Sequence, residues 1–510
     1  MSTSPARRLV ALLLAVAGGF ATTGAFPDYG VWPLSLVGIG LLFLALRGQG
    51  AVFSWFLGTA FGAAFFLPLI SWTDYVVGPV PWVALSVVEA ALVGVACVAW
   101  SFAQRSPVLR SAVLAPLVFA VVWTAGEVLR SSWPFGGFPW GRLAFAHADS
   151  PLGRLAWLGG PTLVSFAVAV VGVLVGLALW RLTRLQVGHA AGAVIVASLV
   201  LVSGLFVPLN TQAQEGRLAV GIVQGNVAEP GLGAFANRRE VLNNHLTGTY
   251  ALLDTTAPGS LDLVLWPENA SDVDPRVDAD AAQQIDAAAA AVDAPILVGT
   301  QRYADGGRYN EGVLWEPGQG ITNVYAKQHP VPFAEYVPLR DLARRFSSAV
   351  DLVTTDMLAG EGAGHLALDS ERLGRVVGIG DVICFEVAYD DVVHGAIKAG
   401  GEVLVVQTNN ANFGMTAEST QQLAMARIRA VETGRATVQV STVGVSAVID
   451  PAGRVLQETE LFTPAQMVAD LPLRSSLTPA VRAGAVPSWI VCVLAGAAAV
   501  LGATRRRPTA

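Results

Sequence analysis

Cysteine is nearly missing from this chain of 510 residues, which contains only Cys97, Cys384 and Cys492. Cys97 and Cys492 lie inside long apolar runs, so a framework of disulfide bonds is excluded. Cys384 is the only thiol in the large polar part of the chain, within the stretch DVICFEVAY. A lone thiol there is either a small buried hydrophobe, as most free cysteines are, or a nucleophile.

Charged residues are also scarce, at 14% of the chain, whereas soluble domains carry roughly 25%. The deficit is concentrated in residues 8–207 and 487–503, and residues 213–483 have the composition of one soluble domain. The net charge of −6 argues against a nucleic-acid partner. The sequence contains no metal-ligand cluster and no phosphate-binding loop, so we expect no metal and no cofactor.

Long apolar runs are what the chain has in abundance, and eight of them are candidate membrane spans of about 20 residues. They lie at 8–26, 31–46, 51–71, 82–103, 112–128, 162–180, 190–207 and 487–503. A cleaved signal peptide is the alternative interpretation of the first run, but seven further spans favour an uncleaved helix. We therefore predict a membrane domain of seven helices over 1–212, a catalytic domain over 213–483, and a final span with a basic tail over 484–510.

The arginines of the apolar regions lie mainly in alternate loops. They are Arg7 and Arg8, Arg47, Arg105 and Arg110, Arg181 and Arg184, and Arg505 to Arg507. Loops rich in arginine stay in the cytoplasm, so both termini are predicted to be cytoplasmic. The domain 213–483, between spans seven and eight, is then extracytoplasmic. The loop 129–161 also carries three arginines, which weakens the pattern slightly.

Residues 213–483 alternate between strand and helix patterns. Apolar, β-branched runs predict strands within 217–227, 261–270, 294–300, 374–385 and 402–414, and two strands within 437–455. Helical spacing predicts helices over 279–292 and 419–434. Helices between buried strands are typical of a layered α/β sandwich.

Three predicted strand ends carry groups that suit catalysis. Glu268 lies in LWPENA, Lys327 and Glu335 lie in VYAKQHPVPFAEYVP, and Cys384 lies in ICFE. Taken singly, each has an ordinary interpretation as a solvated or buried side chain. Together they form a set, because a thiol needs a base, a carboxylate in a dry pocket can serve as one, and an ammonium can stabilise an oxyanion.

Lysine is almost as rare as cysteine, since 30 of the 32 basic residues are arginine and only Lys327 and Lys398 are lysine. Arginine stays charged and has a planar fork, whereas lysine is a compact charge that burial can tune. The choice of lysine at position 327 therefore favours a functional role there.

The order Glu, Lys, Cys, surrounded by eight spans, resembles the apolipoprotein N-acyltransferases, a membrane-embedded branch of the nitrilase superfamily. The matching stretches cover nearly the whole chain. They are GFPWGRLAFA (137–146), VQGN (223–226), LWPENA, YAKQHPVPFAEYVP, CFE, TNNANFG and MARIRAVE (425–432).

This resemblance implies a four-layer αββα domain outside the cytoplasm, on the plasma (inner) membrane of a bacterium. It implies that a phospholipid donates an acyl chain to a cysteine, and that the thioester acylates the α-amino group of a lipoprotein's N-terminal diacylglyceryl-cysteine. Carried over by motif, Glu268 is the base, Lys327 the oxyanion stabiliser and Cys384 the nucleophile. Glu335 supports Lys327, and Glu386 holds the local loop or the substrate.

The chain departs from the family pattern at several positions. The family commonly has Tyr after the nucleophile, where this chain has Phe385, which keeps the ring and loses the hydroxyl. Asn410 and Asn412 stand where Asp and Trp are common, and Phe235 is the only aromatic residue offered where a substrate-facing Trp is expected. Phe385, Asn410 and Phe235 are therefore candidate supporting or substrate-binding residues, and the departures concern substrate preference rather than the triad.

Two alternatives remain open from the residues. One is a membrane-tethered amidase of the nitrilase type, which passes the acyl group to water. The other is a scaffold without activity that docks another envelope enzyme. Eight spans argue against the amidase, because a hydrolase of soluble amides needs only one anchor, and the intact Glu–Lys–Cys set argues against the scaffold. We expect a membrane-bound monomer.

The predicted topology can be tested with reporters fused after Gly216, at the start of the polar domain. Alkaline phosphatase, which is active only outside the cytoplasm, is expected to be active there, and a cytoplasm-dependent reporter is expected to be inactive. The measurement is the activity of both fusions in the same strain. If only the fusion with the cytoplasm-dependent reporter is active, the orientation derived from the arginines is contradicted.

Overall fold

The computed structural model describes residues 4–227 and 239–505, which form two compact units. The first unit holds residues up to Asp74, Pro79–Pro208 and the residues from Ala483 onward. The second holds Tyr75–Gly78 and Leu209–Arg482. The prediction for Phe235 falls outside the described residues.

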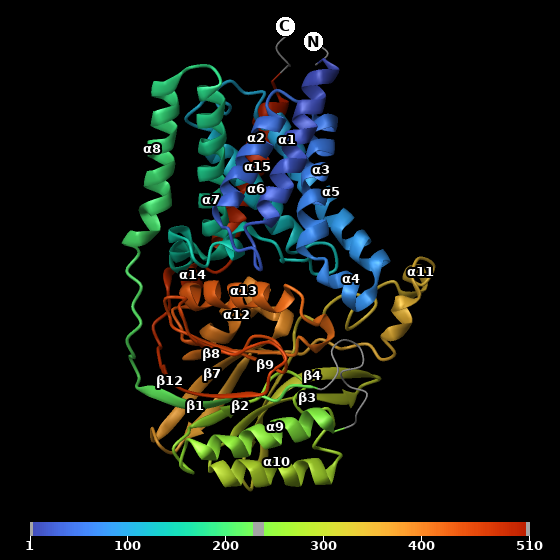
Figure 1. The fold of residues 1–510 in the computed structure, drawn as a ribbon, viewed down its shortest axis with the longest axis vertical. Coiled ribbons are helices and arrows are strands. Elements are labelled where there is room, and N and C mark those ends of the chain that lie inside the picture. The colour runs from blue at the N-terminus through green and yellow to red at the C-terminus, as the bar shows by residue number, and fades with distance from the viewer. Residues whose placement is uncertain (1–3, 228–238, 506–510) are drawn as a thin grey trace. The chain divides into compact units, whose positions relative to one another are not determined.

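The first unit contains a helix at each of the eight predicted spans (Figure 1). They are α1 (Pro5–Thr23), α2 (Pro33–Leu46), α3 (Ala51–Leu69), α5 (Pro79–Ala103), α6 (Ala115–Arg130), α7 (Ala156–Leu182), α8 (Val187–Ser203) and α15 (Val486–Ala503). Within the described residues, six helices are long and apolar enough to cross a membrane, whereas α2 and α6 have only 14 and 16 residues. In α6 a proline, Pro116, occupies the first turn, so the helix begins later than predicted.

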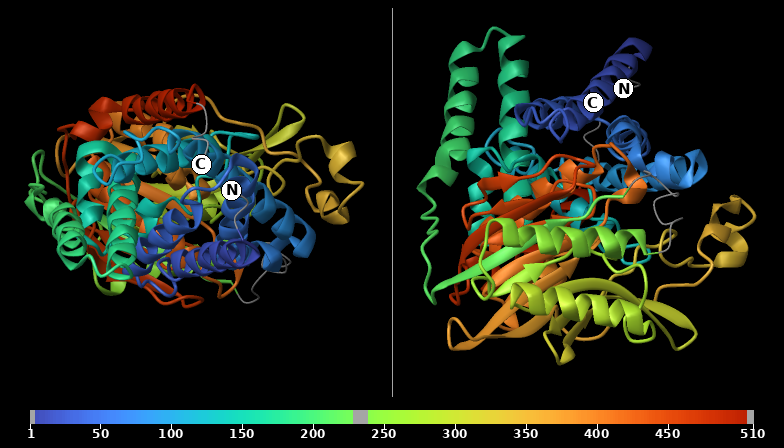
Figure 2. Two further views of the ribbon diagram at one scale, coloured as in Figure 1. Left: turned by 90° about the horizontal axis from the view of Figure 1, so that it is seen from above. Right: turned by 60° about the horizontal axis from the view of Figure 1, so that its bottom comes forward.

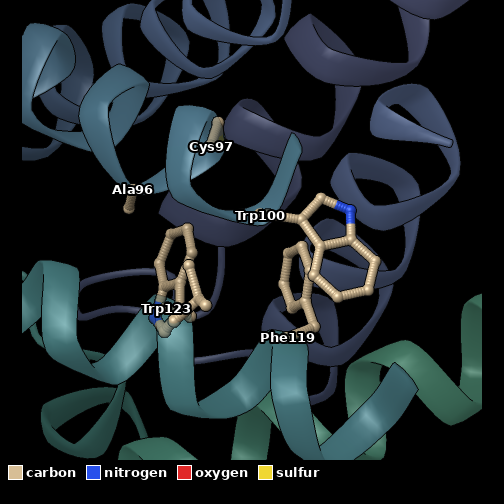
Figure 3. A pocket seen from close by; sticks show the side chains of 6 residues that line it. Ala96, Cys97, Trp100, Phe119 and Trp123 are labelled. Carbon is tan, nitrogen blue, oxygen red and sulfur yellow. The ribbon is translucent and has the colours of Figure 1, made fainter. Parts of the chain in front are cut away.

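Small residues let the helices of the first unit pack closely. A Cβ added to Gly62 of α3 would lie 2.5 Å from the Cα of Ala90 in α5, so only glycine allows this approach. Figure 3 shows a small pocket between α5 and α6 with an apolar lining. Its lining residues are Ala96, Cys97, Trp100, Phe119, Val122 and Trp123. Cys97 therefore contributes to helix packing.

A buried ion pair anchors the segment that follows α6. The guanidinium of Arg130 lies 3.4 Å from the carboxylate of Glu89, and it donates hydrogen bonds to the carbonyl oxygens of Phe138 and Trp140. Glu127 accepts a hydrogen bond from the backbone N–H of Leu143 at 2.8 Å. Charged side chains inside the unit thus fix the fold of the stretch GFPWGRLAF.

The second unit contains two six-stranded sheets within the part of the chain that the structure describes. The first has the order β12-β1-β2-β3-β4-β5 and the second the order β11-β10-β9-β8-β7-β6. The first sheet consists of β1 (Arg217–Gln224), β2 (Leu263–Leu265), β3 (Ile296–Ala304), β4 (Gly307–Glu316), β5 (Gly320–Ala326) and β12 (Ala465–Pro472). The second consists of β6 (His365–Ser370), β7 (Arg375–Ile383), β8 (Val403–Thr408), β9 (Thr437–Ser441), β10 (Ala447–Ile449) and β11 (Val455–Glu458).

Helices cover the outer face of each sheet, as Figures 1 and 2 show. They are α9 (Glu240–Ala251) and α10 (Ala279–Val292) on the first sheet, and α12 (Asp390–Lys398) and α13 (Glu418–Thr433) on the second. Apolar side chains from both sheets, such as Leu265 and Val405, form a shared core between them. The predicted αββα sandwich is confirmed. The segment 437–455, predicted as two strands, contains β9, β10 and the start of β11.

Candidate active site

The predicted catalytic side chains follow the ends of three strands in the second unit. Glu268 lies three residues after β2, Lys327 directly after β5, and Cys384 directly after β7. The first two come from one sheet and the third from the other. Gly299 of β3 leaves room for the turn that carries Glu268. A Cβ atom added to Gly299 would lie only 2.8 Å from the Cα of Glu268.

The carboxyl group of Glu268 is buried, with 4% of the residue exposed, and is held on both oxygens. The Asn310 side-chain amide donates to Oε1 at 2.6 Å, and the backbone N–H of Asn409 donates to Oε2 at 3.1 Å. Burial raises the pKa of Glu268 above its ordinary value, although the nearby ammonium of Lys327 acts in the opposite direction. A buried carboxylate with a raised pKa is suited to accept a proton.

Lys327 is 1% exposed and lies between two carboxylates. Its Nζ atom is 2.7 Å from Oε1 of Glu335 and 3.7 Å from Oε1 of Glu268. Burial alone would lower the pKa of Lys327, but these two carboxylates outweigh burial and raise it. Lys327 therefore remains a compact ammonium ion that can stabilise negative charge on a substrate oxygen.

Cys384 is half-buried and begins the 3₁₀ turn Cys384–Ala388. Its φ of +56° lies in the left-handed region, which costs a non-glycine residue on the order of 1–3 kcal/mol and is often retained at functional sites. Burial and the carboxylate of Glu268 raise the pKa of the Cys384 thiol well above its ordinary value, against the effect of Lys327. The resting thiol is therefore neutral and needs a base.

Glu386 ties the turn of Cys384 to the segment that leaves Lys327. Both of its carboxylate oxygens accept hydrogen bonds, and burial raises its pKa even though these donors oppose the shift. The donors are the backbone N–H groups of Gln328, His329 and Ile383, at 2.6, 3.1 and 2.8 Å, and the hydroxyl of Tyr325, at 2.9 Å. Glu386 thus contacts the protein around Cys384, and Tyr325 is a partner that the sequence did not indicate.

Arg429 of α13 holds the other end of the same turn. Its guanidinium donates to the carbonyl oxygens of Val387 at 2.7 Å and Ala388 at 2.8 Å. Its charge is balanced by Glu432 at 2.5 Å and Asp390 at 2.8 Å. Sequence reasoning gave Arg429 no role, although the helical spacing of MARIRAVE was a usable signal.

The remaining predicted residues lie around this centre. The ring of Phe385 makes an edge contact with Tyr389, with the centroids 5.7 Å apart. Asn410 is buried, and its amide donates to Glu418 at 2.6 Å and to Gln422 at 3.0 Å. Among the residues that the structure describes, no group of three or more His, Cys, Asp or Glu side chains could hold a metal ion.

The geometry supplies a thiol, a buried carboxylate and a buried ammonium within one cluster. The carboxylate can take the thiol proton, the sulfur can attack a carbonyl carbon, and the ammonium can stabilise the resulting oxyanion. Such a set supports acyl transfer through a covalent thioester.

Comparisons with known proteins match both units. The family model of the apolipoprotein N-acyltransferase N-terminal domain matches residues 18–174, and the carbon-nitrogen hydrolase model matches residues 240–476. The apolipoprotein N-acyltransferase of Mycolicibacterium smegmatis is 37% identical, over 97% of this chain and 85% of that protein. The same enzyme of Pseudomonas aeruginosa PAO1 is 31% identical, over 96% of this chain and 94% of that protein. A solved amidase of the nitrilase superfamily, from Nesterenkonia AN1, is 16% identical with a TM-score of 0.39, over 54% of this chain and 96% of that one.

The bridging role of Glu386 predicts a loss of stability in Glu386→Gln. The new NH₂ group faces N–H or O–H donors, and each buried polar group left unpaired costs about 1–3 kcal/mol. We expect the melting temperature in detergent to fall by roughly 2–10 °C, measured by thermal unfolding. Glu371→Gln, which alters an exposed carboxylate, is the matched control. Equal melting temperatures for the two variants contradict the role of Glu386.

Proposed function

The chain belongs to the family of apolipoprotein N-acyltransferases, and on that basis we propose that it acts through a thioester on Cys384, with Glu268 as the base and Lys327 as the oxyanion stabiliser. Its activity is the N-acylation of lipoproteins, and it is a protein of the bacterial inner membrane. The observation that carries the proposed mechanism is the Lys327 ammonium, buried 3.7 Å from Glu268 in the cluster that contains the lone thiol.

The first half-reaction takes an acyl chain from a membrane phospholipid. Glu268 accepts the proton of the Cys384 thiol while the sulfur attacks the ester carbonyl carbon, and the oxyanion faces the Nζ of Lys327. The tetrahedral intermediate collapses with cleavage of the carbon–oxygen ester bond. The departing glycerol oxygen takes the proton from Glu268, which leaves a lysophospholipid and the thioester.

The second half-reaction forms the amide. The α-amino group of the diacylglyceryl-cysteine attacks the thioester carbonyl, and Glu268 accepts a proton from the amine. The carbon–sulfur bond then breaks, and the thiolate regains the proton from Glu268. The same base and the same oxyanion stabiliser serve both steps, because donor and acceptor occupy the site in turn.

Neighbouring side chains hold these three groups in place. We assign Glu335 to the support of Lys327, since their charged atoms lie 2.7 Å apart. Glu386 supports the nucleophile turn, Phe385 packs at its start, and Asn410 belongs to a buried network beside it. Phe235 remains a proposed substrate contact.

The alternatives of a tethered amidase and an inactive scaffold are not favoured, because the likeness to acyltransferases extends over the membrane unit as well. We propose an extracytoplasmic catalytic domain and cytoplasmic termini. This orientation is supported by the arginine pattern and by the start of α1 and the end of α15, which lie at the same end of the first unit (Figure 1).

The proposed thioester predicts an acyl adduct on Cys384. We expect the purified protein, incubated with phospholipid and without a lipoprotein acceptor, to gain the mass of one acyl chain at this residue. The measurement is mass spectrometry of the intact protein and of its peptides. Release of the adduct on adding a diacylglyceryl peptide completes the test, and an adduct confined to another residue contradicts the mechanism.

Serine and alanine variants supply the controls for this experiment. Cys384→Ser is expected to lose both adduct and transfer, because a hydroxyl is far less acidic than a thiol. Cys97→Ala and Cys492→Ala are expected to keep both the adduct and the transfer activity. These two thiols lie in membrane helices, far in sequence from the proposed catalytic residues. Transfer by Cys384→Ser at the wild-type rate removes Cys384 from the mechanism.

The role of Lys327 predicts that Lys327→Arg is nearly as damaging as Lys327→Ala. A guanidinium is larger and planar, and cannot place one compact charge between Glu268 and Glu335. Loss of an oxyanion donor typically lowers the rate by about 10²–10³. The measurement is the single-turnover acylation rate in nanodiscs, with donor binding measured separately and expected to change little.

Lys398→Arg is the matched control, because Lys398 is the other lysine of the chain and is exposed at the end of α12. It is expected to keep the wild-type rate. An acylation rate for Lys327→Arg within about threefold of wild type shows that any positive charge suffices, and moves the oxyanion role to other donors.

A further inference from the structure

The sulfur of Cys384 has polar neighbours that the mechanism above leaves without a role. The Nε2 atom of Gln422 lies 3.7 Å from the sulfur, within the range of a hydrogen bond to sulfur, and the hydroxyl of Thr408 lies 3.5 Å from it. Gln422 is fully buried in α13, and Thr408 is the last residue of β8. The contacts of these two residues determine which of them donates to the sulfur.

The orientation of the Gln422 amide follows from its other contacts. Its Oε1 atom accepts hydrogen bonds from the hydroxyl of Thr408 at 2.9 Å and from the Nδ2 of Asn410 at 3.0 Å. A flipped amide would turn its NH₂ group toward the Nδ2 of Asn410, which can only donate, so the oxygen faces Asn410 and the nitrogen faces the sulfur. The single proton of Thr408 is used in its shorter bond to Gln422, which leaves Gln422 as the donor to the sulfur.

Asn410 is oriented in the same way by its own partners. Its Nδ2 atom also donates to Oε2 of Glu418 at 2.6 Å, and its Oδ1 atom accepts a hydrogen bond from the hydroxyl of Ser441 at 2.6 Å. Oε2 of Glu418 accepts in this contact also when the carboxyl carries a proton on its other oxygen, so a flipped Asn410 would place oxygen against oxygen there. Glu418 and Gln422 are four residues apart, on one face of α13, so the helix presents both to the network.

We propose that Gln422 is a further catalytic residue, which donates a hydrogen bond to the sulfur of Cys384, and that Asn410 and Glu418 are positioning residues that hold its amide in the donating orientation. This inference rests on the proposed role of Cys384 as the nucleophile. The sulfur carries negative charge twice in the cycle, when it attacks the ester and when it leaves the thioester. An amide donor favours the thiolate at both points without giving up its own proton.

None of the charged groups around the sulfur is assigned to donate a hydrogen bond to it, so an uncharged donor can take this role. Glu268, Lys327 and Glu418 are the titratable groups that act on Cys384. Burial raises the pKa of Glu418 to about 8, so this carboxyl is largely protonated at neutral pH and adds little negative charge beside the thiolate. Lys327 is already held by Glu335 and Glu268 and is assigned to the substrate oxygen. Gln422 thus acts on the sulfur, and Lys327 on the oxyanion.

The test is the pH dependence of alkylation of Cys384 by iodoacetamide, which reports the thiolate and needs no lipid. It uses the full chain in detergent with Cys97→Ala and Cys492→Ala, so that one thiol remains. In Gln422→Met, which keeps a similar volume and removes the donor, we expect the profile to move to higher pH by about one unit. The rate at a fixed pH between 7 and 9 then falls about tenfold.

Gln439→Met is the matched control, because Gln439 is also fully buried and its amide donates to the carbonyl oxygen of Val445 at 2.9 Å. Its profile is expected to coincide with that of the parent protein.

Glu418→Leu is expected to shift the alkylation profile in the same direction as Gln422→Met. Glu418→Gln is expected to restore most of the parent profile, since an amide oxygen also accepts from Asn410. A purely structural role for Glu418 would move the melting temperature and leave the profile in place.

A Gln422→Met profile that coincides with the parent profile overturns the proposal. If this variant does not fold, Gln422→Asn is measured, which keeps an amide but withdraws it from the sulfur by one methylene group. An unchanged profile there overturns the proposal as well. Failure of the proposed function is separate, because it shows as a wild-type protein without a lipid-derived adduct on Cys384, whatever the alkylation profile.

Discussion

The Lys327 ammonium is buried, and a buried ammonium is stable only when carboxylates lie close to it. Glu268 meets this requirement from the turn after β2, and Glu335 meets it from the segment that follows Lys327 itself. Glu335 also accepts a hydrogen bond from the backbone N–H of Val331 at 2.7 Å, which folds that segment back toward the lysine. The same electrostatic requirement therefore places both the proposed base and the proposed oxyanion stabiliser.

The proposed nucleophile, Cys384, comes from the other sheet, and its position relative to Lys327 also depends on buried charged groups. Cys384 occupies a left-handed conformation at the end of β7, and its turn is fixed at one end by Glu386 and at the other by Arg429. Glu386 also binds backbone groups next to Lys327. A carboxylate thus fixes the distance between thiol and ammonium across the two sheets, and the helix that carries Arg429 also carries the neighbours of the sulfur.

Residue type and local pattern predicted the positions of the apolar, buried strands and of two helices of the second unit. The helix α10 spans the residues predicted for it, and α13 is shifted by one residue. β4 was missed because its polar residues, such as Asn310 and Glu311, are buried through pairing rather than through apolar character. β12 was missed because it lies at a sheet edge, where its first six residues are only partly buried or exposed and only its last two are buried. The network of Gln422 and Glu418 could not be predicted, since it depends on how α13 packs against β8 and the turn of Cys384.

The scarcity of lysine gives this protein a built-in spectroscopic reporter. The chain has two lysines, and only Lys327 is buried, so isotopic labelling of lysine side chains yields one signal from the catalytic cluster and one from an exposed helix end. The shift of the Lys327 ammonium is sensitive to the charge on Glu268 and Glu335. Magnetic resonance can therefore follow where the proton resides in the resting enzyme and in the proposed thioester, without an added probe or a substitution.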